Sequence, residues 1–121
     1  MPRPIAAVVS CPALRHNLQV ARSRAAGSRL WAVVKARAYG HGLEHAVLAF
    51  DDADGLALLE FDGAQRLRDL GWRKPLLMLE GAFEPQDLET AGRLGLTLGV
   101  HHPDQLAWFG AYRGPRLHTY L

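Results

Sequence analysis

Lys35 is the side chain whose type and position point most directly to chemistry in this sequence. It follows an apolar run, residues 31–34, and precedes Tyr39, Gly40 and Gly42. An amine among apolar side chains is poorly hydrated, which favours the neutral, nucleophilic form that a Schiff base requires. The Tyr39 hydroxyl can donate a hydrogen bond to a phosphate, and the glycines let the backbone approach a ligand. The alternative is a strand-terminal lysine that only extends into solvent.

The elements that must position Lys35 are short apolar runs alternating with amphipathic helix patterns. Strands are expected at 30–36, 55–60, 75–80, 96–100 and 116–121, which gives a spacing of 20 to 25 residues. Helices are expected from Ser10 to Gly27, over 62–70, and from starts at Pro85 and Pro103. Strands that are apolar on both sides and alternate with helices predict a parallel sheet with βαβ connections.

The fold class that follows is α/β, specifically the N-terminal part of a (β/α)₈ barrel of the TIM type. No G-x-G-x-x-G follows the first predicted strand, which removes the main sign of a dinucleotide-binding sheet. A full barrel takes about 250 residues, so the 121 residues hold about four βα units plus a fifth strand. Lys35 would then lie at the carboxyl end of a barrel strand, where barrel active sites are built. The run from Ile5 to Ser10 is also β-like.

Composition limits the partners and the location. Apolar residues are 49% of the chain, charged residues are 21%, and the formal net charge is +2, so we expect a globular protein without a nucleic-acid partner. No apolar run exceeds five residues, so no membrane-spanning helix is expected. Cys11 is the single cysteine, which precludes an intrachain disulfide and makes the cytoplasm the default location.

The segment AVVKARAYGHG, residues 32–42, resembles the cofactor-lysine signature of the alanine racemases, which are fold-type III pyridoxal-phosphate enzymes. Residues 13–18 are similar to that family's first helix, 55–68 to its second strand and helix, and 75–81 to its third strand. The resemblance covers nearly the whole chain. Arg37 is a departure, because many members carry Asn at this position.

The resemblance implies a cofactor, a substrate and a role for four residues. Pyridoxal 5'-phosphate would be bound to Lys35 as an internal aldimine, and Lys35 would also serve as one of two bases at the substrate's α-carbon. Tyr39 would bond the cofactor phosphate, while Val33 and Leu79 would line the cofactor pocket. The implied activity is an isomerase that interconverts L-alanine and D-alanine, a small amino-acid substrate, and supplies D-alanine for peptidoglycan.

The resemblance also implies parts that these 121 residues do not contain. The family's second base is a tyrosine from a later β-rich domain of the partner subunit in a homodimer, and neither Tyr112 nor Tyr120 matches it. Residues 1–10 would join that β domain, whereas 11–121 would form the N-terminal half of the cofactor-binding barrel. We therefore expect a chain that stops in mid-barrel and is inactive alone as a racemase.

Three alternatives stay open. The first is a pyridoxal-phosphate-binding barrel without turnover, and the second is an amino-acid racemase of broader specificity. The third is a zinc site at His41-Gly42-Leu43-Glu44-His45, which fits the H-x-x-E-H pattern. We expect no metal there, because Gly40 and Gly42 place His41 in a loop rather than in a regular helix. The pair His101-His102 is better explained as the start of a helix.

Overall fold

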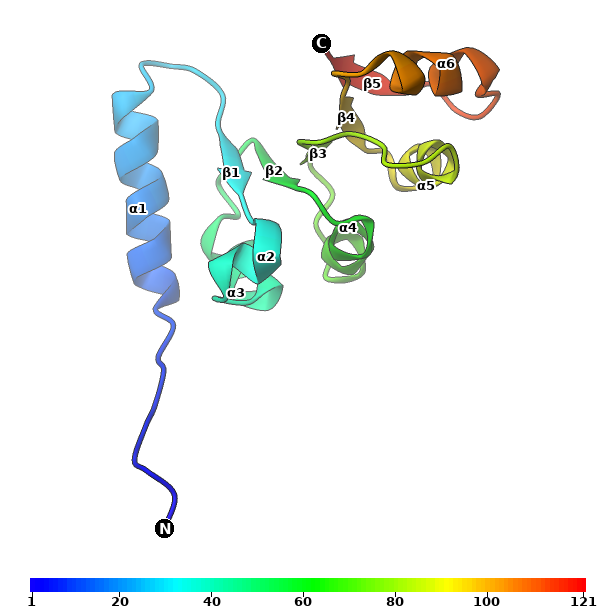
Figure 1. The fold of residues 1–121 in the computed structure, drawn as a ribbon. Coiled ribbons are helices and arrows are strands. Elements are labelled where there is room, and N and C mark those ends of the chain that lie inside the picture. Colours follow the sequence, from blue (N-terminus) through cyan, green and yellow to red (C-terminus); the bar gives the residue numbers. More distant parts are fainter.

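The protein is described by a computed structural model that covers residues 1–121. Its centre is a five-stranded parallel sheet in which the strands pair in chain order, β1-β2-β3-β4-β5 (Figure 1). The strands are β1 (Trp31–Val33), β2 (Gly55–Leu58), β3 (Leu76–Met78), β4 (Thr97–Gly99) and β5 (His118–Tyr120).

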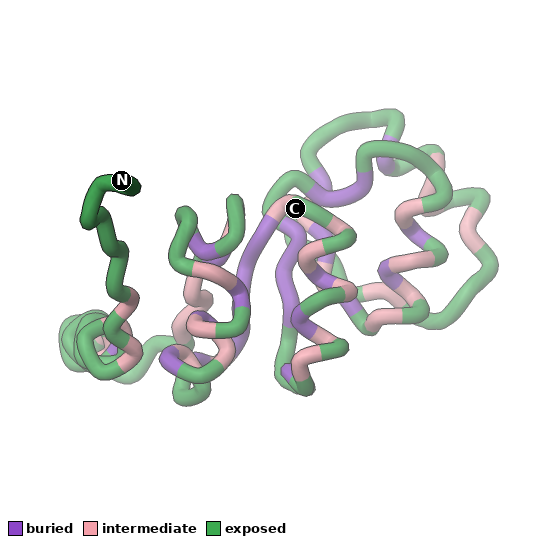
Figure 2. Tube along the Cα trace, turned by 90° about the horizontal axis from the view of Figure 1, so that it is seen from below, coloured by how far each residue is buried: buried purple, intermediate pink, exposed green.

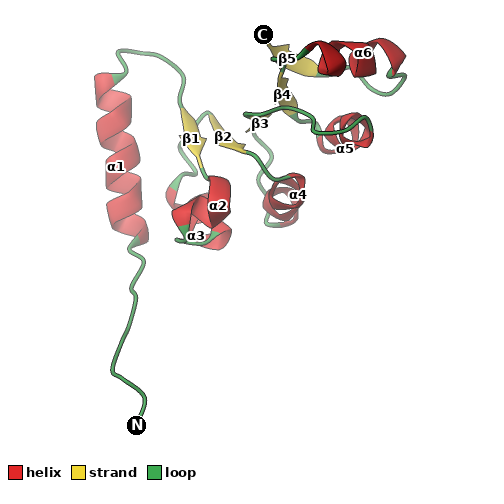
Figure 3. Ribbon diagram, viewed as in Figure 1, coloured by secondary structure: helices red, strands yellow, loops and turns green.

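Helices connect the strands, as parallel pairing requires (Figure 3). They are α1 (Cys11–Arg24), α2 (Lys35–Tyr39), α3 (Leu43–Ala49), α4 (Phe61–Asp69), α5 (Gln86–Leu94) and α6 (Pro103–Ala111). Three starts follow the sequence signals. The Ser10 hydroxyl accepts a hydrogen bond from Ala13 N at 3.2 Å, α5 begins after Pro85, and α6 begins at Pro103 with His102 as its N-cap. None of these helices has the length and apolar content that crossing a membrane requires.

One face of the sheet packs against the helices and forms the core. Alternate strand residues point to opposite faces, and those on the helix side are completely buried. They are Leu56, Leu58, Leu76, Met78 and Leu98. Small or branched apolar residues of the helices, such as Ala46, Ala64, Leu67, Leu88 and Ala91, complete the cluster (Figure 2). Burial of this layer is the main source of stability.

The other face of the sheet is concave. The rings of Trp31 on β1 and Tyr120 on β5 meet edge to face with centroids 6.4 Å apart, although three strands lie between them. A flat sheet would separate β1 from β5 by about 19 Å, four spacings of about 4.8 Å. The sheet therefore curves strongly, as the wall of a barrel does. The predicted arrangement, the N-terminal part of a (β/α)₈ barrel with four βα units and a fifth strand, is confirmed.

One strand prediction stays open and another needs correction. Residues 1–10 form no strand within this chain; the segment extends away from the sheet, and Ile5 and Val8 are exposed (Figure 1). The prediction that this segment joins a later β domain concerns residues outside 1–121 and stays a prediction. The five sheet strands are present but are three or four residues long, shorter than predicted. The missing residues lie mainly at the carboxyl ends, where the chain leaves the sheet to form loops.

Candidate active site

Lys35 lies directly beyond the carboxyl end of β1, as the sequence predicted, and its side chain is half-buried. The residue before it is anchored in the sheet, because Val34 N donates to Ala57 O of β2 at 2.8 Å and the Val34 side chain is 1% exposed. The backbone that carries Lys35 is thus fixed by a buried strand end. The carboxyl ends of the strands form the edge at which barrel enzymes assemble their active sites.

The chain after Lys35 forms a left-handed helical turn, which the sequence did not predict. Ala36, Arg37 and Ala38 have φ of 51°, 54° and 54° with ψ near 48°, and φ of Tyr39 is 56°. These are the angles of a left-handed α-helix, which costs an L-residue about 1–2 kcal/mol. Four successive residues in this conformation, none of them glycine, persist only where surrounding contacts hold them. A strained turn of this kind beside a candidate nucleophile is typical of functional sites.

Backbone and side-chain hydrogen bonds hold this turn. Ala38 N donates to Val34 O at 2.8 Å and Gly42 N to Arg37 O at 2.8 Å. Nδ1 of His41 lies 2.7 Å from Ala38 O. Gly40 and Gly42, with φ of 88° and 95°, then return the chain to the right-handed helix α3.

Val33 and Leu79 lie on the concave face and remain accessible. Val33, Ala57 and Leu77 form one row across the first three strands. Leu79 lies two residues beyond Leu77 and continues the ladder, since Leu79 N donates to Leu58 O at 2.9 Å. Their exposed fractions are 39% for Val33 and 38% for Leu79, against 0% for Met78 on the opposite face. Two apolar side chains therefore line the open face next to the end of β1.

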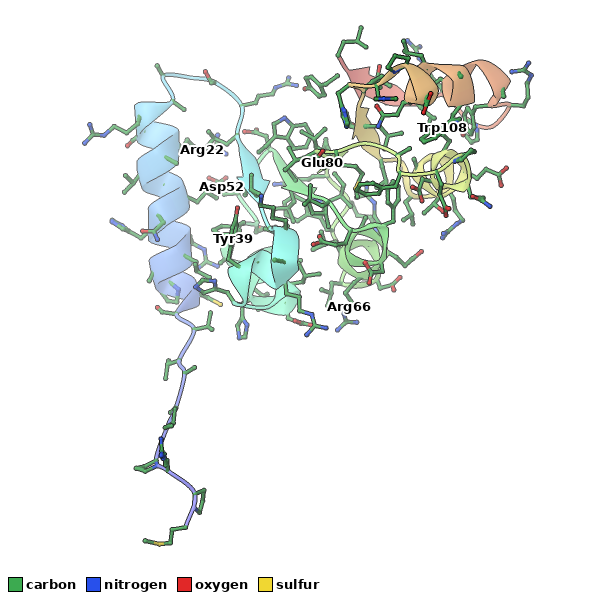
Figure 4. All side chains as sticks on the ribbon, in the orientation of Figure 1. Arg22, Tyr39, Asp52, Arg66, Glu80 and Trp108 are labelled. Carbon is green, nitrogen blue, oxygen red and sulfur yellow. The ribbon has the colours of Figure 1, made fainter.

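Tyr39 ends the left-handed turn and is 61% exposed. Figure 4 shows its side chain projecting from α2 on the side of α1, away from Arg66 on α4. Its hydroxyl makes no hydrogen bond within the chain and is free to donate to a ligand. The structure thus places Val33, Lys35 and Leu79 along the concave face and its edge, with Tyr39 one turn further on.

Two residues of this edge escaped the sequence reasoning, because their contacts join segments more than 20 residues apart. The carboxylate of Glu60, after β2, accepts a hydrogen bond from Ala36 N at 3.1 Å. The buried amide of Gln105 donates to Glu80 O at 3.1 Å and to Ala82 O at 3.0 Å, joining the loop after β3 to α6. For Gln105 the sequence signal is a glutamine on an otherwise apolar helix face. For Glu60 the sequence gives no such signal.

Gly81 and Gly99 bring the loops after β3 and β4 into close approach. A Cβ atom on Gly81, whose φ is 68°, would lie 1.9 Å from Gly99 O. Only glycine fits this position, because the backbones of the two loops pack directly against each other.

A cavity lies on the helix side of the left-handed turn. It has a volume of about 820 Å³ and is lined by residues in and next to α2, α3 and α4, including Val34, Arg37, His41 and Glu60. The four predicted site residues do not line it, because they belong to the concave face and the loop edge. At its mouth Arg66 donates to Glu44 at 2.8 Å, and this hydrogen bond lowers the pKa of the Glu44 carboxyl below its usual value.

The H-x-x-E-H segment does not have the geometry of a zinc site. His41 lies before the helix, with Gly42 as the N-cap of α3, so His41 and His45 are not on one helical face. Nδ1 of His45 instead lies 2.8 Å from His41 O. No group of three His, Cys, Asp or Glu side chains comes together in the structure in a way that could hold a metal ion.

Known proteins are similar to this chain in sequence and in structure. The family model described as "Alanine racemase, N-terminal domain" matches residues 9–120. The chain belongs to this family. An alanine racemase from Leptothrix cholodnii is 53% identical over 118 residues, which cover 98% of this chain and 31% of that protein.

Solved structures agree with the family assignment. The biosynthetic alanine racemase from Pseudomonas aeruginosa superposes with a TM-score of 0.79 and 40% identity, covering 84% of this chain and 28% of that one. A histidine racemase from Leuconostoc mesenteroides superposes with a TM-score of 0.73 and 30% identity, covering 83% of this chain and 27% of that one. The chain therefore spans about a third of the length of these relatives.

Proposed function

We propose that this chain is the N-terminal part of a pyridoxal-phosphate-dependent alanine racemase, an isomerase that interconverts L-alanine and D-alanine. The observation that carries the proposal is Lys35 at the carboxyl end of β1, on a strained turn, in a chain 53% identical to an alanine racemase. In the cell the proposed role is to supply D-alanine for peptidoglycan.

The residues at the edge of the concave face fit pyridoxal 5'-phosphate. Lys35 at the end of β1 supplies a primary amine, and Val33 and Leu79 supply accessible apolar side chains on the concave face, which suits an aromatic aldehyde. The free, exposed hydroxyl of Tyr39 suits a phosphate oxygen.

We assign each of these residues a role. Lys35 would hold the cofactor through Nζ, Tyr39 would donate its hydroxyl proton to the phosphate, and Val33 and Leu79 would exclude water from the ring. When bound, the cofactor withdraws electrons and makes the proton on the substrate's α-carbon acidic. Lys35 Nζ would also carry that proton to or from one face of the α-carbon.

Inversion needs a second acid–base group on the opposite face, and this group would come from outside residues 1–121. We propose that it is a tyrosine of a β-rich domain in the partner subunit of a homodimer, and that residues 1–10 join that domain. The exposed, extended form of residues 1–10 is compatible with such a partner. By itself the 121-residue chain would then be inactive. The proposed location is the cytoplasm, consistent with Cys11 being unpaired.

A second candidate is an amino-acid racemase of other or broader specificity. The observation in its favour is the structural similarity to a histidine racemase, with a TM-score of 0.73. Rates with L-alanine and L-histidine, measured on the full-length protein, distinguish the two: a preference for histidine would replace the proposed substrate.

The test of the proposal is Lys35→Ala in the full-length protein. The unchanged protein should show the visible absorption band of a lysine-bound cofactor and should racemise alanine. The variant should lose both. A variant that keeps the band unchanged would refute the assignment of Lys35, and a binding protein without turnover would show the band but no racemisation.

A further inference from the structure

Glu60 occupies the N-cap of α4 but does not cap that helix. An N-cap side chain ordinarily accepts a hydrogen bond from the second or third backbone amide of its own helix. Glu60 makes no such bond. Its two carboxylate oxygens accept instead from Ala36 N, at 3.1 Å, and from Leu59 N, at 3.4 Å. It also forms no ion pair. Its polar contacts are therefore directed to the backbone at the ends of β1 and β2.

The two amides on either side of Lys35 are both bound to the β2 segment. Val34 N donates to Ala57 O at 2.8 Å, and Ala36 N donates to Glu60 Oε1 at 3.1 Å. Beyond Val34 the backbone leaves the ladder, so Ala36 N has no strand carbonyl to bond. The Glu60 carboxylate takes the place of that carbonyl. Lys35 is thus held from both sides, by a backbone acceptor before it and a side-chain acceptor after it.

Ala36 is also the first of the four residues in the left-handed conformation. That turn is unfavourable for L-residues, and an acceptor at its first amide opposes its relaxation toward other conformations. A carboxylate is a suitable acceptor, because hydrogen bonds to a charged group are stronger than those between neutral groups.

We propose that Glu60 is a positioning residue for Lys35, whose carboxylate fixes the left-handed turn and thereby the direction in which the Lys35 amine projects. This inference rests on the proposed function for its catalytic consequence, but not for the restraint itself. Glu60 acts through the backbone of Ala36 and touches no reacting atom.

Four variants of the full-length protein test the proposal. Glu60→Ala removes the acceptor, and Glu60→Asp withdraws the carboxylate by one methylene. Glu60→Gln keeps an oxygen at the same distance. Asp62→Ala is the matched control: Asp62 lies on the same helix, and its carboxylate bonds only the amide of Gly63.

The first measurement is amide hydrogen exchange in the cofactor-free protein, read by mass spectrometry over residues 35–41. Glu60→Ala and Glu60→Asp should exchange about fivefold faster there, as expected for losing one exposed hydrogen bond. Glu60→Gln and Asp62→Ala should stay within about twofold of the unchanged protein. Should Glu60→Ala fail to fold, the contrast between Asp and Gln at position 60 decides the question.

The second measurement is the rate at which the visible band appears after pyridoxal 5'-phosphate is added to the cofactor-free protein. With Glu60→Ala or Glu60→Asp the band should form about fivefold more slowly but reach full amplitude, and kcat should fall while KM for alanine stays within about twofold. Equal exchange in all variants, or the same slowing in Asp62→Ala, would overturn the proposal. If even the unchanged protein forms no band, the proposed function fails, and the exchange data still decide whether Glu60 restrains the turn.

Discussion

The two faces of the sheet differ in what their side chains do. On the helix side Leu56, Leu76 and Leu98 are 0% exposed and pack into one continuous cluster. On the concave side Val33 and Leu79 are more than a third exposed, and Lys35 is half-buried at the edge. The same strands therefore carry a buried layer that stabilises the fold and, on the other face, two apolar side chains that stay accessible, although Ala57 and Leu77 between them are buried.

The backbone shows the same division. The helix-side layer is built on regular strands and right-handed helices, whereas the chain after Lys35 adopts four successive left-handed residues. Proteins tolerate such local strain where it places a functional group, and the surrounding core supplies the necessary stability. The difference between the two faces teaches that the residues that stabilise the fold and the residues of the candidate site are separate sets.

The largest expected effect is a difference in stability between alanine variants of two leucines in and just after β3, Leu76 and Leu79. Leu76→Ala removes a fully buried side chain from the helix-side layer and should lower the free energy of unfolding by about 2–5 kcal/mol. Leu79→Ala, on the concave face, should lower it by less than about 1 kcal/mol and should instead weaken cofactor binding. Chemical denaturation and cofactor titration of the full-length protein measure both. Equal destabilisation by the two changes would remove the distinction between the faces.

A smaller effect concerns the strained turn. Arg37→Asn should raise the free energy of unfolding by about 0.5 kcal/mol, because asparagine adopts the left-handed conformation at less cost than arginine. The same substitution at Arg24, in the right-handed helix α1, should be neutral or slightly destabilising. Thermal unfolding of both variants checks the sign. A loss of stability from Arg37→Asn would mean that the arginine side chain, and not only the backbone, supports the turn.

The smallest expected effect is on the pH dependence of stability. It concerns Asp54, which lies away from both faces of the sheet, where α1 contacts the start of β1. The pKa of the Asp54 carboxyl is lowered from its ordinary 3.8, first by the hydrogen bond from Leu30 N at 2.7 Å and further by Arg22. Because the folded-state pKa is the lower one, this stabilisation is present above about pH 4 and is lost as the pH falls through the folded value.

Asp54→Asn should therefore flatten the dependence of Tm on pH below about pH 4. Asp51→Asn is the control, since the Asp51 side chain makes no hydrogen bond or ion pair. A steeper acid dependence in the Asp54 variant than in the control would contradict the assignment.

The helix-side layer could be predicted from the sequence because its signals are local. Apolar runs at regular spacing gave the five strands, and Ser10, Pro85 and Pro103 marked helix starts that the structure confirms. The β-like run from Ile5 to Ser10 pairs with no strand of this chain, and the domain predicted to pair with it lies outside residues 1–121. β-propensity alone makes no strand where no partner strand is present.

The candidate site was predictable only in part. The position of Lys35 at a strand end followed from the sequence, whereas the left-handed turn did not, since alanine, arginine and tyrosine carry no signal for positive φ. The Glu60 contact with Ala36 joins residues 24 apart, and the fold alone brings them together. Long-range polar contacts of this kind leave no periodic pattern in a sequence.

The most direct test of the central claim uses the two lysines of this chain, Lys35 and Lys74. Lys74 lies at the other end of the sheet, where its amine contacts the carbonyls of Asp51 and Ala53. Borohydride reduction of the full-length protein with its cofactor, followed by peptide mapping, shows which lysine carries the pyridoxyl group. Attachment to Lys35 and not to Lys74 is the predicted result. Attachment to Lys74, or to neither lysine in a protein that binds the cofactor, would contradict it.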